Sequence, residues 1–383
     1  MRVLHITRDL LPAVTGGISI AVDGLLQACC ALDGVECAAI SFDGYRPCSR
    51  PGTAAPVILR EDGARVLRVR GGDAPDRALR FAFEFGPEVV CVHHAMLWAL
   101  AEQLRARRAE LRSLLFLHAL QGHQDRLHGL ERPTRSALDE MRAVSRADRI
   151  AVGSRAAEQI LVGAFPEQAD RIRLCRPGIR DSAEAARSAD SHARGACAAG
   201  PLLYTGRFAD LKGTFDLLDA FAILSESKQA RLVVAGGVPD RPRSEMRWRR
   251  RLMDRLPEPA RERVAFVGWL DREALANQLL RASMLVCPGR FETFGQSALE
   301  GMLFGLAVVA TRAGGQAELI EHGHSGLLCE PGDVPALAAA IERLLAEPDL
   351  AIRLGRTAAE QARSQHLWDG RAGEIAHLLG ELA

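Results

Sequence analysis

The sequence predicts an α/β protein made of two parallel-sheet domains, each with helices on both faces of its sheet. Short apolar runs alternate with longer amphipathic stretches along the chain, which is the pattern of strands connected by helices. The alternation stops at residues 181–200, which lack large apolar side chains, and then resumes. The length of 383 residues also suits two domains, since a domain typically holds about 150 residues.

The order of the elements follows from the apolar runs. In the first half of the chain, strands are expected at residues 3–6, 37–41, 66–69, 89–92, 114–117 and 150–152. In the second half, strands are expected at residues 202–204, 232–235, 264–267, 284–287 and 307–310. Amphipathic stretches between them predict helices, among them residues 19–32, 97–111 and 136–145. We therefore expect an N-terminal domain at residues 1–180, a linker at 181–200 and a C-terminal domain at 201–364.

Composition excludes several classes of protein. A net charge of +1 argues against a nucleic-acid-binding protein, which needs a basic surface. No apolar run approaches the ~18 residues of a transmembrane span, and the first residues read as a strand and not as a leader segment. The nine cysteines are scattered and contain no CxxC pair, which favours reduced thiols in a cytoplasmic protein over a metal site. The arginine-rich segment 241–255 is compatible with contact to an anionic membrane surface, although its acidic residues favour an ordinary solvated helix.

The most informative motif follows the expected strand at 284–287. A loop that contains Glu292, Thr293 and Phe294 leads into a helix that is expected to start near Phe294 or Gly295. The free N–H groups of this helix start, near Gly295 and Gln296, form an anion site that suits a diphosphate. Glu292 in the loop and Glu300 two turns later are placed to accept hydrogen bonds from sugar hydroxyls on either side of that anion. The alternative is that both glutamates are ordinary solvated charges.

A second motif follows the strand at 202–204. Arg207 and Lys212 lie between this strand and the next helix, where a guanidinium and an ammonium group bind phosphate oxygens. Only two of the 49 basic residues are lysines, Lys212 and Lys228, so arginine is the background in this chain. An arginine at this place therefore means little by itself, whereas a lysine there points to a function. We expect Lys228 to be replaceable by arginine.

Several loops at strand ends carry further candidates. Glycine-containing loops follow the strands at 232–235 and 264–267, with Gly236 in the first and Trp269 after the second. In the N-terminal half, the loop with Gly16 and Gly17 follows the first strand and precedes a helix, without the GxGxxG pattern of a dinucleotide site. Histidines also end two strands, and we expect a polar loop after the second one. The candidates there are His94 and His118 at the strand ends and His123 and Arg126 in the loop.

Together these motifs resemble the retaining, nucleotide-sugar-dependent glycosyltransferases of family 4, which have the GT-B fold. The resemblance rests on the stretch from Phe291 to Glu300, with its two glutamates seven residues apart, and on the Gly-Arg and Lys-Gly pairs at 206–207 and 212–213. Residues 305–318 and 323–332 extend it. The chain departs from the family pattern at three positions, which hold Arg180 in place of Asp, Gly301 in place of Ala and Ala307 in place of Pro.

The resemblance implies a GT-B architecture, in which two Rossmann-like domains face each other across a cleft. It implies that the terminal segment 365–383 crosses back to the N-terminal domain. It assigns catalytic roles to Glu292, Arg207, Lys212 and His118. It places the donor nucleotide sugar at Gly17, Gly236, Trp269, Thr293, Phe294, Gly295, Gln296 and Glu300. The acceptor is expected near Gly16, His94, His123 and Arg126.

The expected reaction is transfer of a hexose-type sugar from a nucleotide diphosphate sugar to a hydroxyl or amine of a glycan or small molecule. The frequency of donors in the family favours a UDP-sugar. No Asp-x-Asp motif is present, so no metal and no other cofactor are expected. Two alternatives stay open at this stage. One is a sugar-nucleotide epimerase on the same fold, which would need no acceptor. The other is a catalytically silent subunit that binds the nucleotide sugar.

Overall fold

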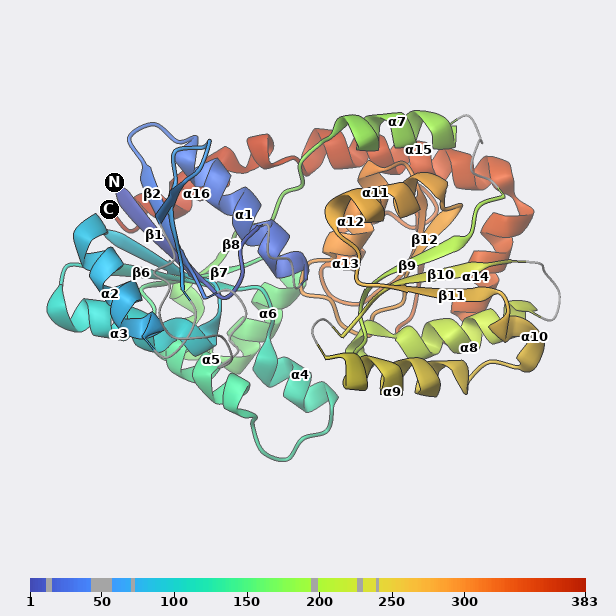
Figure 1. The fold of residues 1–383 in the computed structure, drawn as a ribbon, viewed down its shortest axis with the longest axis horizontal. Coiled ribbons are helices and arrows are strands. Elements are labelled where there is room, and N and C mark those ends of the chain that lie inside the picture. The colour runs from blue at the N-terminus through green and yellow to red at the C-terminus, as the bar shows by residue number, and fades with distance from the viewer. Residues whose placement is uncertain (12–15, 43–56, 70–72, 194–198, 226–229, 239–240) are drawn as a thin grey trace. The chain divides into compact units, whose positions relative to one another are not determined.

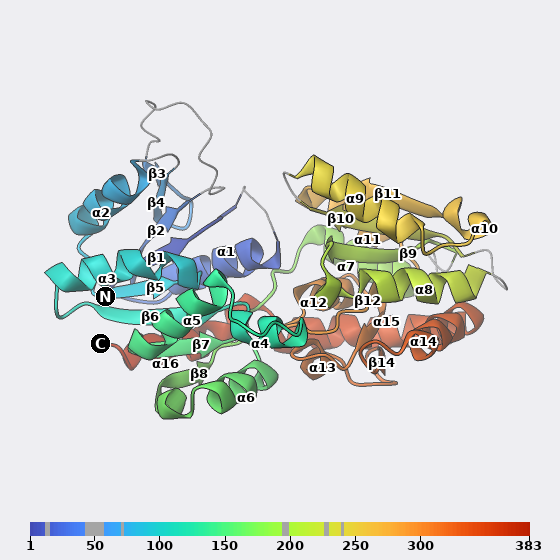
Figure 2. The same cartoon turned by 90° about the horizontal axis from the view of Figure 1, so that it is seen from below.

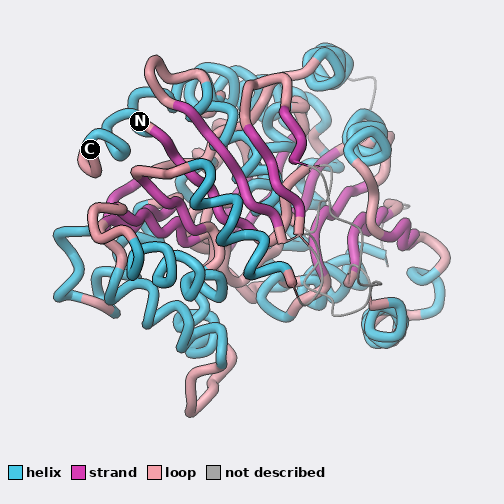
Figure 3. Tube along the Cα trace, turned by 60° about the vertical axis from the view of Figure 1, so that its left-hand side comes forward, coloured by secondary structure: helices cyan, strands magenta, loops and turns pink. Residues whose placement is uncertain are grey.

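A computed structural model describes residues 1–11, 16–42, 57–69, 73–193, 199–225, 230–238 and 241–383. Lys228 lies outside these residues, so the expectation for it has no structural counterpart here. The chain divides into two compact units. Unit 1 comprises Met1–Gly178 and Trp368–Ala383, and unit 2 comprises Ile179–Leu367. Each unit is an α/β structure with a sheet that is mostly or fully parallel, as the alternating sequence pattern predicts, and in Figure 3 helices surround the strands of both.

The sheet of unit 1 has the strand order β3-β4-β2-β1-β5-β6-β7-β8, which Figure 2 shows from top to bottom. All neighbouring strands are parallel except β3, which pairs antiparallel with β4. The chain goes from β1 to β2 on one side and later places β5 on the other side of β1, so the strand order reverses beside β1. The strands are β1 (Arg2–Thr7), β2 (Glu36–Ser41), β3 (Val57–Leu59), β4 (Arg65–Arg68), β5 (Val89–Val92), β6 (Arg112–Leu117), β7 (Arg149–Val152) and β8 (Ile172–Leu174).

Helices cover both faces of this sheet. Figure 1 shows α1 and α16 on one face and α2, α3 and α5 on the other. The helices are α1 (Gly17–Cys30), α2 (Ala74–Phe85), η1 (Ala95–Leu97), α3 (Trp98–Arg107), α4 (Gln121–Leu127), α5 (Arg135–Arg146), α6 (Arg155–Ala164), η2 (Pro166–Arg171), η4 (Trp368–Arg371) and α16 (Ala372–Gly380). Four of the strands are buried on both faces, as expected when helices cover both sides of a parallel sheet.

The C-terminal segment belongs to unit 1, which confirms the predicted return of the chain end to the N-terminal domain. Trp368 is 7% exposed and packs in the core of unit 1 together with Ile375 and Leu379 of α16. Helix α1 carries Gly24 at the contact, where a Cβ would overlap the indole ring of Trp368. The small residue on α1 therefore leaves room for the tryptophan of the returning segment.

The sheet of unit 2 is fully parallel and has the strand order β11-β10-β9-β12-β13-β14. The chain builds β9, β10 and β11 outward in one direction and then returns to place β12 on the other side of β9. The strand order therefore reverses between β9 and β12. The strands are β9 (Leu202–Arg207), β10 (Leu232–Gly237), β11 (Val264–Gly268), β12 (Met284–Cys287), β13 (Ala307–Thr311) and β14 (Leu327–Cys329).

Two apolar cores lie on opposite faces of this sheet. Leu202 and Tyr204 point into one core and Leu203, between them, points into the other. Figure 1 shows α8 and α9 on one face and α11 and α12 on the other. The helices of unit 2 are α7 (Ala183–Ala193), η3 (Asp210–Lys212), α8 (Thr214–Ser225), α9 (Pro242–Met253), α10 (Glu258–Arg261), α11 (Arg272–Arg281), α12 (Gln296–Leu303), α13 (Gln316–Leu319), α14 (Val334–Ala346) and α15 (Pro348–Gln365).

The segment that we expected to be a linker differs from that expectation. Residues 183–193 form helix α7, which belongs to unit 2 and packs against α11, α12 and α15. Ala185 and Ser188 are fully buried, and His192 is bound through both ring nitrogens to backbone carbonyls of Ser188 and Ala282. Small side chains allow a helix to approach its neighbours closely, so a segment without large apolar residues still packs tightly here.

The arginine-rich segment 241–255 forms helix α9. Its Trp248 packs on Phe208 and Phe215, and Arg251 lies over the Trp248 ring. The Trp248 indole therefore packs against side chains of unit 2. Among the helices that the structure describes, none is long and apolar enough to cross a membrane.

Candidate functional site

The candidate site of unit 2 lies where the strand order reverses. In open α/β sheets, ligands bind outside the carboxyl ends of the strands at such a reversal. Here the residues after β9 carry Lys212 at the end of η3, and the residues after β12 carry Glu292. The topology thus brings together two residues that are 80 positions apart in the sequence. They share one pocket with Gly295, Ser297 and Gln316, among other residues.

Lys212 and Glu292, both predicted to be catalytic, form a direct ion pair. The Lys212 ammonium group donates to both oxygens of the Glu292 carboxylate, at 2.7 and 2.8 Å. The side chains are 38% and 20% exposed, so the pair is accessible to a ligand. A phosphate group that approaches Lys212 would compete with Glu292, and the released carboxylate would then be able to accept hydrogen bonds from hydroxyl groups.

The two loops that carry this pair are joined by further contacts. The Arg290 guanidinium donates two hydrogen bonds to the Asp216 carboxylate, at 2.8 and 2.7 Å, and Asp216 is 5% exposed in the first turn of α8. The Arg290 backbone N–H donates to the Leu211 carbonyl at 2.7 Å. These contacts hold the segment before Glu292 against the residues on both sides of Lys212. Sequence reasoning missed Arg290 and Asp216 because arginine is so common in this chain.

Glycines allow the backbone to pack closely around the pair. Gly213, directly after Lys212, has φ +65°, and a Cβ there would overlap the carbonyl oxygen of Pro288. Gly314 has φ +61°, and a Cβ there would overlap the carbonyl oxygen of Glu292. The next residue, Gly315, donates its N–H to that same Glu292 carbonyl at 2.8 Å. The loop with Glu292 is therefore fixed between the start of α8 and the turn before α13.

Helix α12 begins at Gln296, with Gly295 as its N-cap at φ +104°. This matches the predicted helix start within two residues. Both polar atoms of the Gln296 side chain are buried, and the described residues give them no hydrogen-bond partner. The Thr205 hydroxyl, which lines the same pocket as Lys212, is also buried without a partner in the described part of the chain. Unsatisfied buried polar atoms are uncommon, and here they lie beside a helix N-terminus that attracts anions.

Glu300 lies on α12, about one helical turn after its first residue, Gln296. Burial raises the pKa of its carboxyl to about 7, and the Arg272 charge lowers it in part. The group therefore retains a proton more readily than an ordinary glutamate near neutral pH. This carboxyl is suited to hydrogen bonding with hydroxyl groups, which is the role predicted for it.

The other predicted catalytic and donor-binding residues of unit 2 lie at or near strand ends. Arg207 is the last residue of β9 and is exposed, and it does not line the pocket that Lys212 and Glu292 share. Gly236 lies on β10 at φ +139°, where a Cβ would overlap the Gly206 carbonyl oxygen of β9. Trp269 directly follows β11, the edge strand, and is half-buried. Thr293 and Phe294 complete the loop before α12, and Phe294 packs against the apolar core on that face.

In unit 1, Gly16 and Gly17 form the start of α1. Gly16 is the N-cap, and Gly17 is the first helical residue; Thr15 before them lies outside the described residues. The buried Asp9, which follows β1, accepts a hydrogen bond from the Ser19 hydroxyl in the first turn at 3.1 Å. His94 lies next to it, with Nε2 3.8 Å from the Asp9 carboxylate and Nδ1 accepting from the Arg8 N–H at 3.3 Å. The strand reversal beside β1 thus joins the predicted His94 to an aspartate that sequence reasoning missed.

His118 follows β6 and is hydrogen-bonded to another histidine. Its Nε2 lies 3.0 Å from Nδ1 of His93, and Nε2 of His93 lies 3.0 Å from Nδ1 of His5. His5 and His93 lie on or directly after the neighbouring strands β1 and β5. Sequence analysis singled out His118 but did not connect it to His5. The signal was present, because the parallel pairing of β1 with β5 sets His5 opposite Cys91, and His93, two residues later, points to the same face of the sheet.

His123 and Arg126 lie on helix α4, whereas we expected a polar loop, so that expectation was wrong. The buried Asp125 fixes this region by accepting hydrogen bonds from the N–H and the hydroxyl of Thr134, at 2.7 and 3.2 Å. The Glu140 carboxylate accepts from the N–H groups of Gln121 and Gly122, at 2.6 and 3.1 Å, and thereby satisfies the first turn of the helix. Burial and the Arg126 charge lower the pKa of His123.

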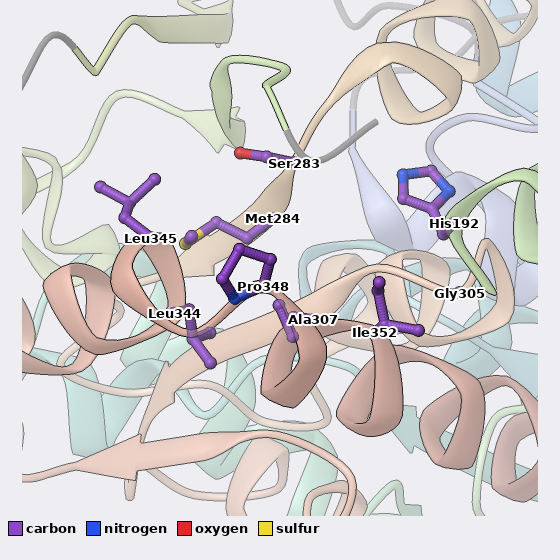
Figure 4. Close-up of a pocket in the computed structure, with 10 residues that line it drawn as sticks. His192, Ser283, Met284, Gly305, Ala307, Leu344, Leu345, Pro348 and Ile352 are labelled. Carbon is purple, nitrogen blue, oxygen red and sulfur yellow. The ribbon is translucent and has the colours of Figure 1, made fainter. Parts of the chain in front are cut away.

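A second hollow in unit 2 has a different character. It lies at the amino ends of β12 and β13, opposite to the edge that carries Lys212 and Glu292. Figure 4 shows the side chains of Leu344, Leu345, Pro348 and Ile352 around it, with His192 at one side. Because its lining is mostly apolar and contains no carboxylate or basic group besides His192, it is a weaker candidate for binding a charged ligand. Among the described residues, no group of three His, Cys, Asp or Glu side chains is placed to hold a metal ion.

The fold and the site together define a class of protein. It consists of two α/β units, and the second unit has a cation, a carboxylate and a helix N-terminus where its strand order reverses. Comparison with known proteins gives the family. Residues 201–361 match the family described as glycosyl transferases group 1, and residues 16–178 match the glycosyl transferase 4-like domain. The chain belongs to this family of glycosyltransferases.

Curated relatives share about a third of their residues with this chain over the matched part. A glycogen synthase of Mycobacterium tuberculosis is 32% identical over 201 residues, which are 52% of this chain and 47% of that protein. A D-inositol 3-phosphate glycosyltransferase of Streptomyces bingchenggensis is 30% identical over 262 residues, which are 65% of this chain and 56% of that protein. The match to the first of these relatives spans about half of its length.

Solved structures share the fold. Sucrose-phosphate synthase from Thermosynechococcus elongatus has a TM-score of 0.82 at 24% identity, covering 100% of this chain and 99% of that one. HepE from Anabaena in complex with UDP-glucose has a TM-score of 0.75 at 18% identity, covering 100% of both chains. These likenesses confirm the predicted GT-B type of fold, with two Rossmann-like units.

Proposed function

We propose that the protein transfers a hexose-type sugar from a nucleotide diphosphate sugar to a hydroxyl or amine of a small-molecule or glycan acceptor, with retention of the anomeric configuration. The observation that carries the proposal is the Lys212–Glu292 pair at the strand reversal, beside the N-terminus of α12. A UDP-sugar is the donor that we propose first, because the similar Anabaena protein was solved with UDP-glucose. Several relatives are glycosyltransferases or synthases of sugar compounds by name, which supports the transfer reaction.

In the proposed reaction, the cationic groups act on the diphosphate. Lys212 leaves Glu292 to contact the phosphate oxygens, and the N–H groups at the start of α12 bind the same anion. Arg207 at the end of β9 adds a second positive charge. Negative charge grows on the leaving diphosphate as the glycosidic bond breaks, so these groups stabilise the transition state more than the ground state. This assignment needs no metal ion.

The carboxylates act on the sugar and the ribose. Glu292, once released by Lys212, accepts hydrogen bonds from hydroxyls of the donor sugar, and Glu300 binds the ribose hydroxyls. His118 of unit 1 keeps the catalytic role that the family resemblance implies for it. The acceptor attacks on the face from which the diphosphate leaves, and the departing phosphate takes the acceptor proton, so that the configuration is retained. We do not assign Glu292 as a nucleophile.

The first test separates catalysis from folding at the ion pair. We expect Lys212→Ala and Glu292→Gln each to lower kcat/KM by about 100-fold or more, the size seen when a group that stabilises transition-state charge is removed. The pair is partly exposed, so its loss costs only about 0–1 kcal/mol of folding free energy. The matched control is Arg343→Ala, which breaks the exposed Arg343–Glu347 pair on α14 and should leave transfer unchanged.

The measurement is release of the nucleoside diphosphate from UDP-, GDP- and ADP-sugars with a panel of acceptors, together with urea unfolding of each variant. Full activity of Lys212→Ala with the best donor would contradict the proposal. Interconversion of the sugar nucleotide without any acceptor would favour an epimerase instead. Tight donor binding with no transfer to any acceptor would favour a silent binding subunit. NMR of the product reads its anomeric configuration, and activity in the presence of a chelator tests metal independence.

A further inference from the structure

Three histidine rings form a continuous hydrogen-bonded column in unit 1. His5, His93 and His118 are linked by two contacts of 3.0 Å, each between Nδ1 of one ring and Nε2 of the next. The rings are nearly parallel, with interplanar angles of 7° and 27°. His5 is 0% and His93 is 2% exposed, whereas His118 has some exposed surface. The column therefore runs from the interior of the sheet to its surface.

All three rings are neutral at physiological pH. Burial lowers the pKa of His5 and of His118 to about 4, and burial together with the neighbouring histidines lowers the pKa of His93 well below its usual value. Each neutral ring carries a hydrogen on only one of its two nitrogens, so that nitrogen donates and the other accepts.

The two contacts couple the tautomers of the three rings. Each contact needs one N–H and one lone pair, because two facing hydrogens repel and two facing lone pairs form no bond. If His5 carries its hydrogen on Nδ1, then His93 and His118 must also carry theirs on Nδ1. If any one ring carries it on Nε2, all three must do so. The position of the hydrogen on His118 is thus determined together with that on His5.

The buried end of the column favours one of the two arrangements. Nε2 of His5 is buried and has no hydrogen-bond partner among the described residues. Orphaned N–H groups are rarer in protein interiors than acceptors that lack a partner. The tautomer with an unprotonated Nε2 and the hydrogen on Nδ1 is therefore favoured for His5.

We propose that His5 and His93 are positioning residues, which hold His118 in the Nδ1–H tautomer so that it offers an N–H, and not a lone pair, to its ligand. Nε2 of His118 is occupied by His93, and the described residues give Nδ1 no hydrogen-bond partner. The identity of this ligand rests on the proposed function, under which the N–H donates to an oxygen of a sugar substrate. The tautomer itself is a property of the free protein.

The test is a long-range ¹H–¹⁵N correlation spectrum of the full chain labelled with ¹⁵N-histidine, at a pH near 8. Single His→Phe variants assign the signals, which is practical for 11 histidines. We expect His5, His93 and His118 all to show the Nδ1–H pattern. The variant His93→Phe keeps an aromatic ring at this position but lacks the N–H that donates to His118. We therefore expect His118 to change to the Nε2–H form that free neutral histidine prefers. His93→Asn places an amide N–H near the position of Nδ1 and should preserve the original tautomer.

The matched control is His324→Gln, an exposed histidine of unit 2, which should leave the His118 signals unchanged. An Nε2–H pattern for His118 in the unmodified protein, or different tautomers within the column, would overturn the proposal. If His93→Phe does not fold, the His93→Asn variant and the spectrum of the unmodified protein still decide the question.

Activity gives a second readout. In His93→Phe we expect KM for the donor to rise about tenfold, as for one lost hydrogen bond, with recovery in His93→Asn. If the tautomers are as proposed but no sugar is transferred by any form of the protein, the proposed function fails while the column stands. If transfer occurs but His118 carries its hydrogen on Nε2, the proposed function stands and the positioning role fails.

Discussion

At the scale of single residues, Glu300 shows how burial changes a carboxyl group that the sequence presents as an ordinary glutamate. Burial raises its pKa from 4.5 to about 7. Between these pH values the folded protein keeps a proton that the unfolded chain releases. Stability contributed by the neutral carboxyl is therefore fully present below pH 4.5 and is lost as the pH rises to about 7.

The substitution Glu300→Gln removes the titrating group while keeping its shape. We expect the midpoint of thermal unfolding, Tm, to rise by a few degrees at pH 8, relative to the unmodified protein, and to change little at pH 4.5. The comparison uses Tm measured at both pH values. Glu342→Gln, at an exposed position on α14, serves as the control and should show the same small difference at both. An equal effect of Glu300→Gln at the two pH values would contradict the role of burial.

At the scale of elements, the close approach of η3 to the end of β12 depends on Gly213. A side chain there meets two obstacles, since φ is +65° and a Cβ would overlap the Pro288 carbonyl oxygen. Gly332 has a similar φ of +81° but no atom within 4 Å of a Cβ. Gly332→Ala thus measures the backbone strain alone, about 1–2 kcal/mol.

We expect Gly213→Ala to lower the free energy of unfolding by about 1–3 kcal/mol more than Gly332→Ala does, because the backbone must move to relieve the overlap. That movement displaces Lys212, so sugar transfer should fall in Gly213→Ala and persist in Gly332→Ala. Urea unfolding and initial transfer rates give the two readouts. Equal losses of stability in the two variants would show that the contact with Pro288 does not matter.

The elements also show what the sequence can and cannot predict. Apolar runs predicted the core strands well, because strands buried on both faces consist mostly of apolar residues, although β1 also carries the buried His5. The pairing of Lys212 with Glu292 was not visible in the sequence, since it depends on β12 returning to the side of β9. Helix α7 was missed because its buried face is made of small residues. The role of His5 was missed because its partner, His93, is 88 residues away on a neighbouring strand.

At the scale of the whole molecule, the two units have cores of their own, and the first core is completed by the end of the chain. Trp368 and α16 fill the face of the first sheet that α1 covers. Glu381 binds Arg149 of β7 at 2.5 Å and Arg173 of β8 at 2.9 Å, and these contacts lower the pKa of its carboxyl to about 2. Unit 1 therefore depends on contacts between residues at opposite ends of the sequence, whereas unit 2 is continuous.

This difference predicts that the units respond separately to loss of the returning segment's tryptophan. Trp368→Ala leaves a cavity beside Gly24 and should lower the stability of unit 1 by about 3–5 kcal/mol. Amide hydrogen exchange should then become faster in β1 and β5 while β9 and β12 keep their protection, because each sheet has its own core. The control is His377→Ala on α16, a side chain that is 77% exposed and lies outside the core. Faster exchange in both sheets of Trp368→Ala would mean that the two units unfold as one, despite their separate cores.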